Sequence, residues 1–140
     1  MSRYLLDTNI VSNITKAVPS EPLVAWFADQ ADQDLFIASL TLAEIWRGVL
    51  QKPAGRKRVQ LKQWFEGPDG PPSLFSGRIL PFDERAALIW GRLMSEGARM
   101  GRPRSSLDMI IAAVAEANAC IVVTGNERDF AGLKFINPMD

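Results

Sequence analysis

Short apolar runs recur along this chain of 140 residues, and segments with helical spacing separate them. The runs are too short for buried helices, and one of them, CIVV from Cys120, is apolar throughout. Such a run is typical of a strand buried on both faces of a parallel sheet. Because parallel strands need helical crossovers, the alternation predicts an α/β fold. We expect strands at 3–6 and in the segments DLFIAS, RILPF, CIVVT and LKFINP.

The predicted architecture is a three-layer α/β/α sandwich around a central, mainly parallel sheet. A chain of this length favours one domain, spanning residues 1–140. The Pro- and Gly-rich segment PDGPPSLFSG is interpreted as a loop inside that domain. Ser39 or Thr41 is expected to cap the helix that follows the second strand.

The absence of histidine restricts the chemistry of the chain. It excludes His-based triads, zinc sites that use His, and the commonest general base. The single cysteine, Cys120, has no internal disulfide partner and is expected to be a buried thiol. The 16 basic and 16 acidic residues cancel, so a nucleic-acid partner would have to bind a local basic surface.

Neither a membrane span nor a signal peptide is expected. No apolar run in the sequence approaches the roughly 20 residues that cross a bilayer. Asp7 interrupts the first apolar stretch too early for a signal peptide. We therefore expect a cytoplasmic protein without membrane association.

Acidic and amide side chains occupy mainly apolar surroundings or follow predicted strands. In open α/β sheets, ligands bind beyond the carboxyl ends of the strands. Side chains that follow the strands are therefore expected to share one edge of the sheet. The positions that stand out in this way are Asp7, Glu44, Asp108, Asn126 and Asp129.

Each acid also has a purely structural interpretation. Asp7 or Asp129 would cap a helix or a turn, Glu44 would be a solvated residue, and Asp108 would complement its helix dipole, worth about 0.3–1 kcal/mol. Three carboxylates in one cleft would instead repel one another, and their pKa values would rise unless a cation bound them. Mg²⁺ and Mn²⁺ prefer oxygen ligands, and such a site suits phosphodiester hydrolysis without histidine.

Four segments, in order, resemble the PIN-domain ribonucleases: LLDTNIVS, TLAEIWRG, SLDMIIAAVA and VVTGNERDF. Within that family the chain looks like the toxin subunit of a type II toxin–antitoxin pair, the VapC and FitB kind, and GRILPFDERAA is similar to FitB. The resemblance covers essentially the whole chain. It implies a PIN fold, a metal-dependent endoribonuclease acting on RNA, often a structured RNA such as tRNA, a homodimer, and a small antitoxin whose tail blocks the active site.

The resemblance also implies roles for individual residues. Asp7, Glu44 and Asp108 match the three catalytic acids that bind Mg²⁺ or Mn²⁺, and Glu44 or Asp108 would take the proton of the attacking water. The fourth metal position is often Asp in the family and is Asn126 here; Asp129 would serve in its place or be structural. The polar positions that shape the pocket are Thr8, Asn9 and Thr124, of which Asn9 would orient Asp7 by hydrogen bonding.

Two basic runs are candidates for phosphate contacts with RNA. One is GRKRVQLK; the other, ARMGRPRS, supplies Arg102 and Arg104 just before Asp108. The alternative for both runs is a solvated helix face. Trp64 and the other aromatic residues of the early helices are expected in the core, or in a groove for the antitoxin or a second copy.

Two other functions stay open from the sequence. One is a catalytically inactive α/β binding module, which the loss of a carboxylate at Asn126 allows. The other is a metal-dependent nuclease or phosphatase that uses the same site on DNA.

Overall fold

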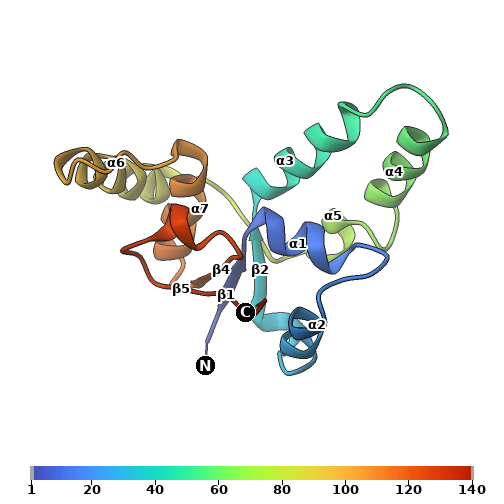
Figure 1. The fold of residues 1–140 in the computed structure, drawn as a ribbon, viewed down its shortest axis with the longest axis horizontal. Helices are drawn as coiled ribbons and strands as arrows, with labels where there is room; N and C mark the ends of the chain where they lie inside the picture. Colours follow the sequence, from blue (N-terminus) through green and yellow to red (C-terminus); the bar gives the residue numbers. More distant parts are fainter. Residues whose placement is uncertain (1, 140) are drawn as a thin grey trace.

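The computed structural model describes residues 2–139, and in it five strands form one parallel sheet in the order β3-β2-β1-β4-β5 (Figure 1). Strand β1 (Tyr4–Leu6) is central and pairs with β2 (Leu35–Ala38) and β4 (Ile121–Val123). The outer strands are β3 (Ile79–Leu80) and β5 (Phe135–Ile136). The predicted α/β class with a parallel sheet is confirmed.

The central strands are buried on both faces because their side chains alternate across the sheet. Leu5 and Val122 belong to the apolar cluster on one face. Leu6 and Val123 belong to the cluster on the other. The central strands therefore need apolar side chains at successive positions, which explains why apolar and polar residues do not alternate along them.

Helices cover both faces and complete the three layers (Figure 1). Helices α6 (Glu84–Arg99) and α7 (Ser106–Ala117) pack on one face. On the other side lie α1 (Thr8–Ile14), α2 (Glu21–Ala28) and α3 (Ser39–Leu50), and α4 (Arg56–Glu66) folds back along α3 as a helical hairpin that stands away from the sheet. The short elements are α5 (Pro71–Leu74) and the 3₁₀ turns η1 (Asp32–Asp34) and η2 (Glu127–Phe130). Within residues 2–139, no helix has the length and apolar character needed to cross a membrane.

The interpretation of the segment PDGPPSLFSG as a loop is wrong in part, because it contains helix α5. Pro71 begins this helix, where its fixed φ suits the first turn and its missing N–H has no intrahelical partner to lose. Gly70 precedes it at a close approach, since a Cβ there would lie 2.0 Å from the Phe65 carbonyl oxygen. The chain can fold back onto the end of α4 only with a glycine at this position.

The predicted cap of α3 is also wrong. The N-cap position is Ala38, and no side chain bonds to the helix start. The Thr41 hydroxyl is fully buried and lies 3.2 Å from the Thr8 hydroxyl. Thr41 is therefore part of a polar network between helices instead of a cap.

Candidate active site

The carboxyl ends of β1 and β4 bring the first two polar side chains of the site together. Asp7 follows β1 and Thr124 follows β4, and the two residues are only 4% and 0% exposed. The Asp7 backbone N–H donates to the Val123 carbonyl at 2.9 Å, so the two strand ends lie side by side. Asp7 is also the N-cap of α1, because its Oδ1 accepts a hydrogen bond from the Thr8 N–H at 2.8 Å. The helix-cap interpretation of Asp7 is thus correct for one of its oxygens.

The second oxygen of Asp7 belongs to a different network. Asp7 Oδ2 accepts from the Thr124 hydroxyl at 2.9 Å and from Asn9 Nδ2 at 3.0 Å, the bond expected of Asn9. The Asn9 Oδ1 in turn accepts from the Gly125 N–H at 3.0 Å. The segment after β4 and the first turn of α1 therefore hold this carboxylate in one orientation.

Helix α3 brings Glu44 to the same edge of the sheet. The Thr8 hydroxyl donates to Glu44 Oε1 at 2.6 Å, and the buried Thr41 hydroxyl adjoins Thr8. The sequence analysis did not identify Thr41 as a site residue. The available signal was its spacing, since Thr41 and Glu44 stand three residues apart and hence on one face of the helix.

Helix α7 contributes Asp108 in its first turn, and the cap of this helix is the Ser105 hydroxyl, which accepts from the Asp108 N–H at 3.2 Å. The carboxyl of Asp129 lies near that of Asp108, and its charge helps to raise the pKa of Asp108. Asn126 Nδ2 donates to the Asp129 carboxylate, and the Asn126 N–H donates to the Thr124 hydroxyl at 2.9 Å. Asp129, and not Asn126, therefore places a carboxylate beside Asp108.

The pKa values of the acids show that they affect one another. Burial raises the pKa of Asp7, the charge of Glu44 raises it further, and hydrogen bonds from Thr124, Thr8 and Asn9 oppose the rise. Burial is also the main reason why the pKa of Asp108 rises to about 6, and the charges of Asp7 and Asp129 add to it. Asp7, Glu44, Asp108 and Asp129 thus form one electrostatically coupled group, in which Asp7 and Asp108 carry the raised pKa values.

The donors of this group suit a hard divalent cation, because carboxylate, amide and hydroxyl oxygens are what Mg²⁺ and Mn²⁺ bind. Among the described residues, no three acidic, His or Cys side chains are close enough in this conformation to hold one ion. The fit therefore rests on chemistry: a cation among the acids would remove the burial and repulsion costs that raise the pKa values of Asp7 and Asp108.

The two arginines expected to contact phosphates differ in their surroundings. Arg104 Nη1 donates to the Leu93 carbonyl of α6 at 2.7 Å. Its aliphatic part packs on Gly97, where a Cβ would lie 2.9 Å from Arg104 Cγ. In this structure Arg104 thus fixes the loop before α7 onto α6. Arg102 is exposed, and its backbone N–H donates to the Gly97 carbonyl at 2.9 Å.

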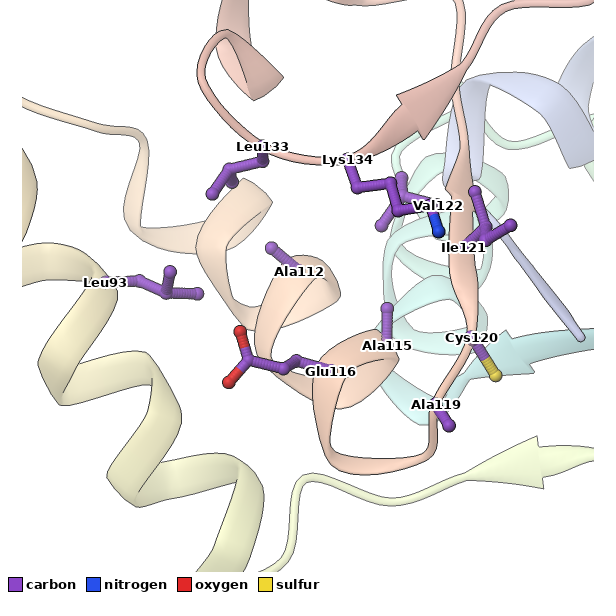
Figure 2. A pocket seen from close by; sticks show the side chains of 10 residues that line it. All are labelled: Leu93, Ala112, Ala115, Glu116, Ala119, Cys120, Ile121, Val122, Leu133 and Lys134. Atoms are coloured by element: carbon purple, nitrogen blue, oxygen red, sulfur yellow. The ribbon is translucent and has the colours of Figure 1, made fainter.

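A cavity of about 370 Å³ beside the second half of α7 does not belong to this site (Figure 2). Ala112, Ala115 and Glu116 of α7 line it together with Cys120, and the predicted site residues do not. The Cys120 thiol, expected to be buried, is only half-buried, and burial raises its pKa. The cavity lies on the α6–α7 side, away from the coupled carboxylates.

Comparison with known proteins identifies one family over nearly the whole chain. The PIN domain matches residues 4–136. The chain is 36% identical over 138 residues to the VapC ribonuclease Y4jK of Sinorhizobium fredii, covering 97% of each protein. It is 35% identical over 136 residues to the toxin FitB of Neisseria gonorrhoeae, covering 96% of each.

Solved structures agree with these similarities. A structure of FitAB bound to an IR36 DNA fragment matches this chain with a TM-score of 0.88 and 33% identity. The match covers 98% of this chain and 96% of that one. The central sheet and the helices on both of its faces are therefore those of a fold already seen in a complex of this kind.

Proposed function

This chain belongs to the PIN-domain family, and from that membership we propose that it is an endoribonuclease, the toxin of a type II toxin–antitoxin pair. Similarity over at least 96% of the chain to a VapC ribonuclease and to the toxin FitB supports the proposal. The observation that carries it is the electrostatic coupling of Asp7, Glu44 and Asp108 at the carboxyl edge of the sheet. Structural caps alone do not require these acids to share one edge of the sheet.

The residues that would hold Mg²⁺ or Mn²⁺ are Asp7, Glu44 and Asp108. We assign the fourth position to Asp129, because its charge acts on the Asp108 carboxyl while the Asn126 amide donates a hydrogen bond to it. When bound, the ion would orient the scissile phosphate, lower the pKa of a water molecule and stabilise the leaving oxygen.

The surrounding side chains prepare the carboxylates for this task. The Thr124 hydroxyl and the Asn9 amide fix the orientation of Asp7, and the Thr8 hydroxyl fixes that of Glu44. Glu44 or Asp108 accepts the proton of the water that attacks the phosphodiester. The site needs no histidine for this reaction.

The same family membership supports a partner and an assembly. FitAB, whose structure resembles this chain, is a complex, and we propose a small antitoxin as the partner here. We also propose a homodimer, with RNA in the cytoplasm as the substrate. Size-exclusion chromatography with light scattering, on the chain alone and co-expressed with the neighbouring short reading frame, tests both assemblies.

Cleavage of total RNA with Mg²⁺, Mn²⁺ or EDTA tests the activity. Wild type should cut RNA with either metal and not in EDTA, and Asp7→Asn and Asp108→Asn should be inactive. The control is Asp69→Asn, an exposed acid in the loop between α4 and α5, which should cut like wild type. Cleavage that survives EDTA or both site substitutions contradicts the metal–carboxylate mechanism.

Two further arms separate the competing functions. Single- and double-stranded DNA are assayed beside RNA, and faster cleavage of DNA would favour a DNA nuclease. Expression is induced with and without the neighbouring reading frame, and growth should stop only in its absence. Unchanged growth, together with no cleavage of any substrate, would point to an inactive binding module.

A further inference from the structure

The segment that follows β5 is held beside the turn that follows β4. The Thr124 N–H donates to the Ile136 carbonyl at 3.0 Å, so the two strands stay paired to their ends. The Asn137 side chain then anchors the segment, because its Nδ2 donates to Glu127 Oε2 of η2 at 2.8 Å and its Oδ1 accepts from the Met139 N–H at 3.0 Å. The backbone of Met139 therefore has a defined position.

The Met139 side chain occupies the space that a side chain at position 125 would need. A Cβ on Gly125 would lie 2.1 Å from Met139 Cε and 3.7 Å from Asn9 Oδ1. Met139 also packs against the apolar cluster that contains Leu6 and Val123. Glycine at position 125 thus allows the methionine to lie against the side of the backbone that also faces the Asn9 amide.

Two hydrogen bonds connect Gly125 to a carboxylate of the proposed metal site. The Gly125 N–H donates to Asn9 Oδ1 at 3.0 Å, and Asn9 Nδ2 donates to Asp7 Oδ2 at 3.0 Å. One planar amide makes both bonds, so a shift of the Gly125 N–H moves the donor that orients Asp7. Whatever holds Gly125 in place therefore also holds this carboxylate.

We propose that Met139 is a positioning residue for the active site, which by packing on Gly125 holds the Asn9 amide in the orientation that binds Asp7. Its thioether is unbranched and adapts to the irregular space beside a glycine. It also keeps water, which would compete for the Asn9 oxygen, away from the Gly125–Asn9 bond. The inference rests on the proposed metal-dependent function and adds to it a residue from outside the acidic group.

Two variants disturb this contact from opposite sides. Met139→Ala removes the group that packs on Gly125. Gly125→Ala displaces that group instead, because Met139 Cε is the free end of a flexible side chain and yields before the backbone does. Met139→Leu keeps an apolar side chain of similar volume and should behave like wild type.

Ile79→Ala is the matched control for lost packing. Ile79 packs against the same apolar cluster as Met139, but it lies on β3, the edge strand opposite β5. Its truncation removes apolar contacts from that cluster without disturbing the turn after β4. It separates a local effect on the active site from a general loss of stability.

The first measurement needs neither metal nor RNA: hydrogen exchange of the backbone N–H of residue 125, followed by NMR in EDTA. The reference is the Asp7 N–H, whose bond to the Val123 carbonyl reports opening of the sheet. Relative to this reference, exchange at residue 125 should be about tenfold faster in Met139→Ala and in Gly125→Ala. Met139→Leu and Ile79→Ala should keep the wild-type ratio.

The second measurement is the Kd for Mn²⁺ by isothermal titration, under conditions in which circular dichroism shows every variant to be folded. Met139→Ala should raise this Kd about three- to tenfold, less than the ten- to hundredfold typical of losing a direct partner of a metal ligand. In an Asn9→Ala background, which lacks the connecting amide, Met139→Ala should raise it no further. Ile79→Ala should leave the Kd unchanged.

Wild-type exchange at residue 125 in Met139→Ala overturns the inference. So does an effect of Met139→Ala on the Kd that is as large without the Asn9 amide as with it, because Met139 would then act on overall stability. If wild type binds Mn²⁺ and Met139→Ala binds it equally well, the inference alone has failed. If wild type binds no Mn²⁺ while Met139→Ala speeds exchange, the proposed metal-dependent function has failed and the connection from Met139 to Asn9 stands.

Discussion

The Thr8 hydroxyl donates a hydrogen bond to Glu44 Oε1 at 2.6 Å, although Thr8 and Glu44 stand 36 positions apart in the chain. Thr8 begins α1 directly after Asp7, and Glu44 lies in the middle of α3. One short bond therefore couples the acid at the end of β1 to the acid that the second crossover helix supplies. The bond fixes where Glu44 can point before any metal or RNA is present.

Replacing Thr8 by valine removes this hydroxyl and keeps the shape of the side chain. The backbone N–H of residue 8 still donates to the Asp7 carboxylate, which caps the helix, so α1 is expected to fold as in wild type. Loss of a partner that orients a metal ligand typically lowers metal affinity or activity ten- to a hundredfold, and we expect that loss in Mn²⁺-dependent RNA cleavage. Thr8→Ser retains the hydroxyl and should recover most of the activity. Full activity in Thr8→Val would show that Glu44 needs no such support.

Asp108 makes stability depend on pH in the metal-free protein. Its pKa is raised from 3.8 to about 6, so the folded state binds the proton more tightly than the unfolded state. The resulting stabilisation is present below about pH 4 and is lost as the pH rises through about 6. At neutral pH in EDTA, the free energy of unfolding of Asp108→Asn should therefore exceed that of wild type by about 1 kcal/mol, once solvent screening is allowed for.

Urea unfolding in EDTA across this pH range measures the effect. The variant should show a flatter pH profile than wild type, with a remaining slope from Asp7, whose pKa is also raised. Asp69→Asn serves as the exposed control and should retain the wild-type profile. A profile for Asp108→Asn that superposes on that of wild type would rule out this origin of the pH dependence.

Metal binding should offset the loss of folding stability that burial and mutual repulsion of the carboxylates cause. A ligand that binds only the folded state at a hundred times its Kd adds about 2.7 kcal/mol of stability, which raises the melting temperature by several degrees. We expect Mn²⁺ and Mg²⁺ to produce this shift in wild type and to lose it in Asp7→Asn. Differential scanning fluorimetry against a metal titration is the measurement. A protein that melts at the same temperature with and without either ion has no such site.

The sequence alone predicted the layers and drew attention to the three acids, because both the layers and these positions depend on local pattern. The apolar run around Leu5 and Leu6 is explained by burial on both faces of the sheet, and Asp7 is prominent because it ends that run. The role of Thr41 was not predicted, since a buried hydroxyl next to Thr8 depends on how α1 packs on α3. Helix α5 was missed for a similar reason: prolines suit a loop or a first helical turn equally well, and the close approach of Gly70 to Phe65 decides between them.

The fourth acid shows the same limit. The family resemblance left the fourth position open between Asn126 and Asp129, and only the three-dimensional arrangement places the Asp129 carboxyl near Asp108. Asp129→Ala is therefore expected to reduce Mn²⁺ affinity and cleavage ten- to a hundredfold, and Asn126→Ala to have a smaller effect through the lost bond to Asp129. Isothermal titration with Mn²⁺ and single-turnover cleavage rank the two variants. The reverse order would assign the position to Asn126.

Arg102 and Arg104 stand two residues apart and should respond to alanine substitution in opposite ways. Arg104 donates to the Leu93 carbonyl and packs on Gly97, so Arg104→Ala should cost about 1–3 kcal/mol of folding free energy by breaking a charged hydrogen bond and removing that packing. Arg102 is exposed, and its replacement should leave the urea midpoint unchanged. If Arg102 contacts an RNA phosphate, its loss should weaken RNA binding at low salt and reduce the salt slope by about 0.7. Chemical unfolding and RNA-binding anisotropy on both variants separate these effects. If Arg104→Ala is stably folded but loses RNA affinity while Arg102→Ala does not, Arg104 must leave the Leu93 carbonyl to bind the substrate.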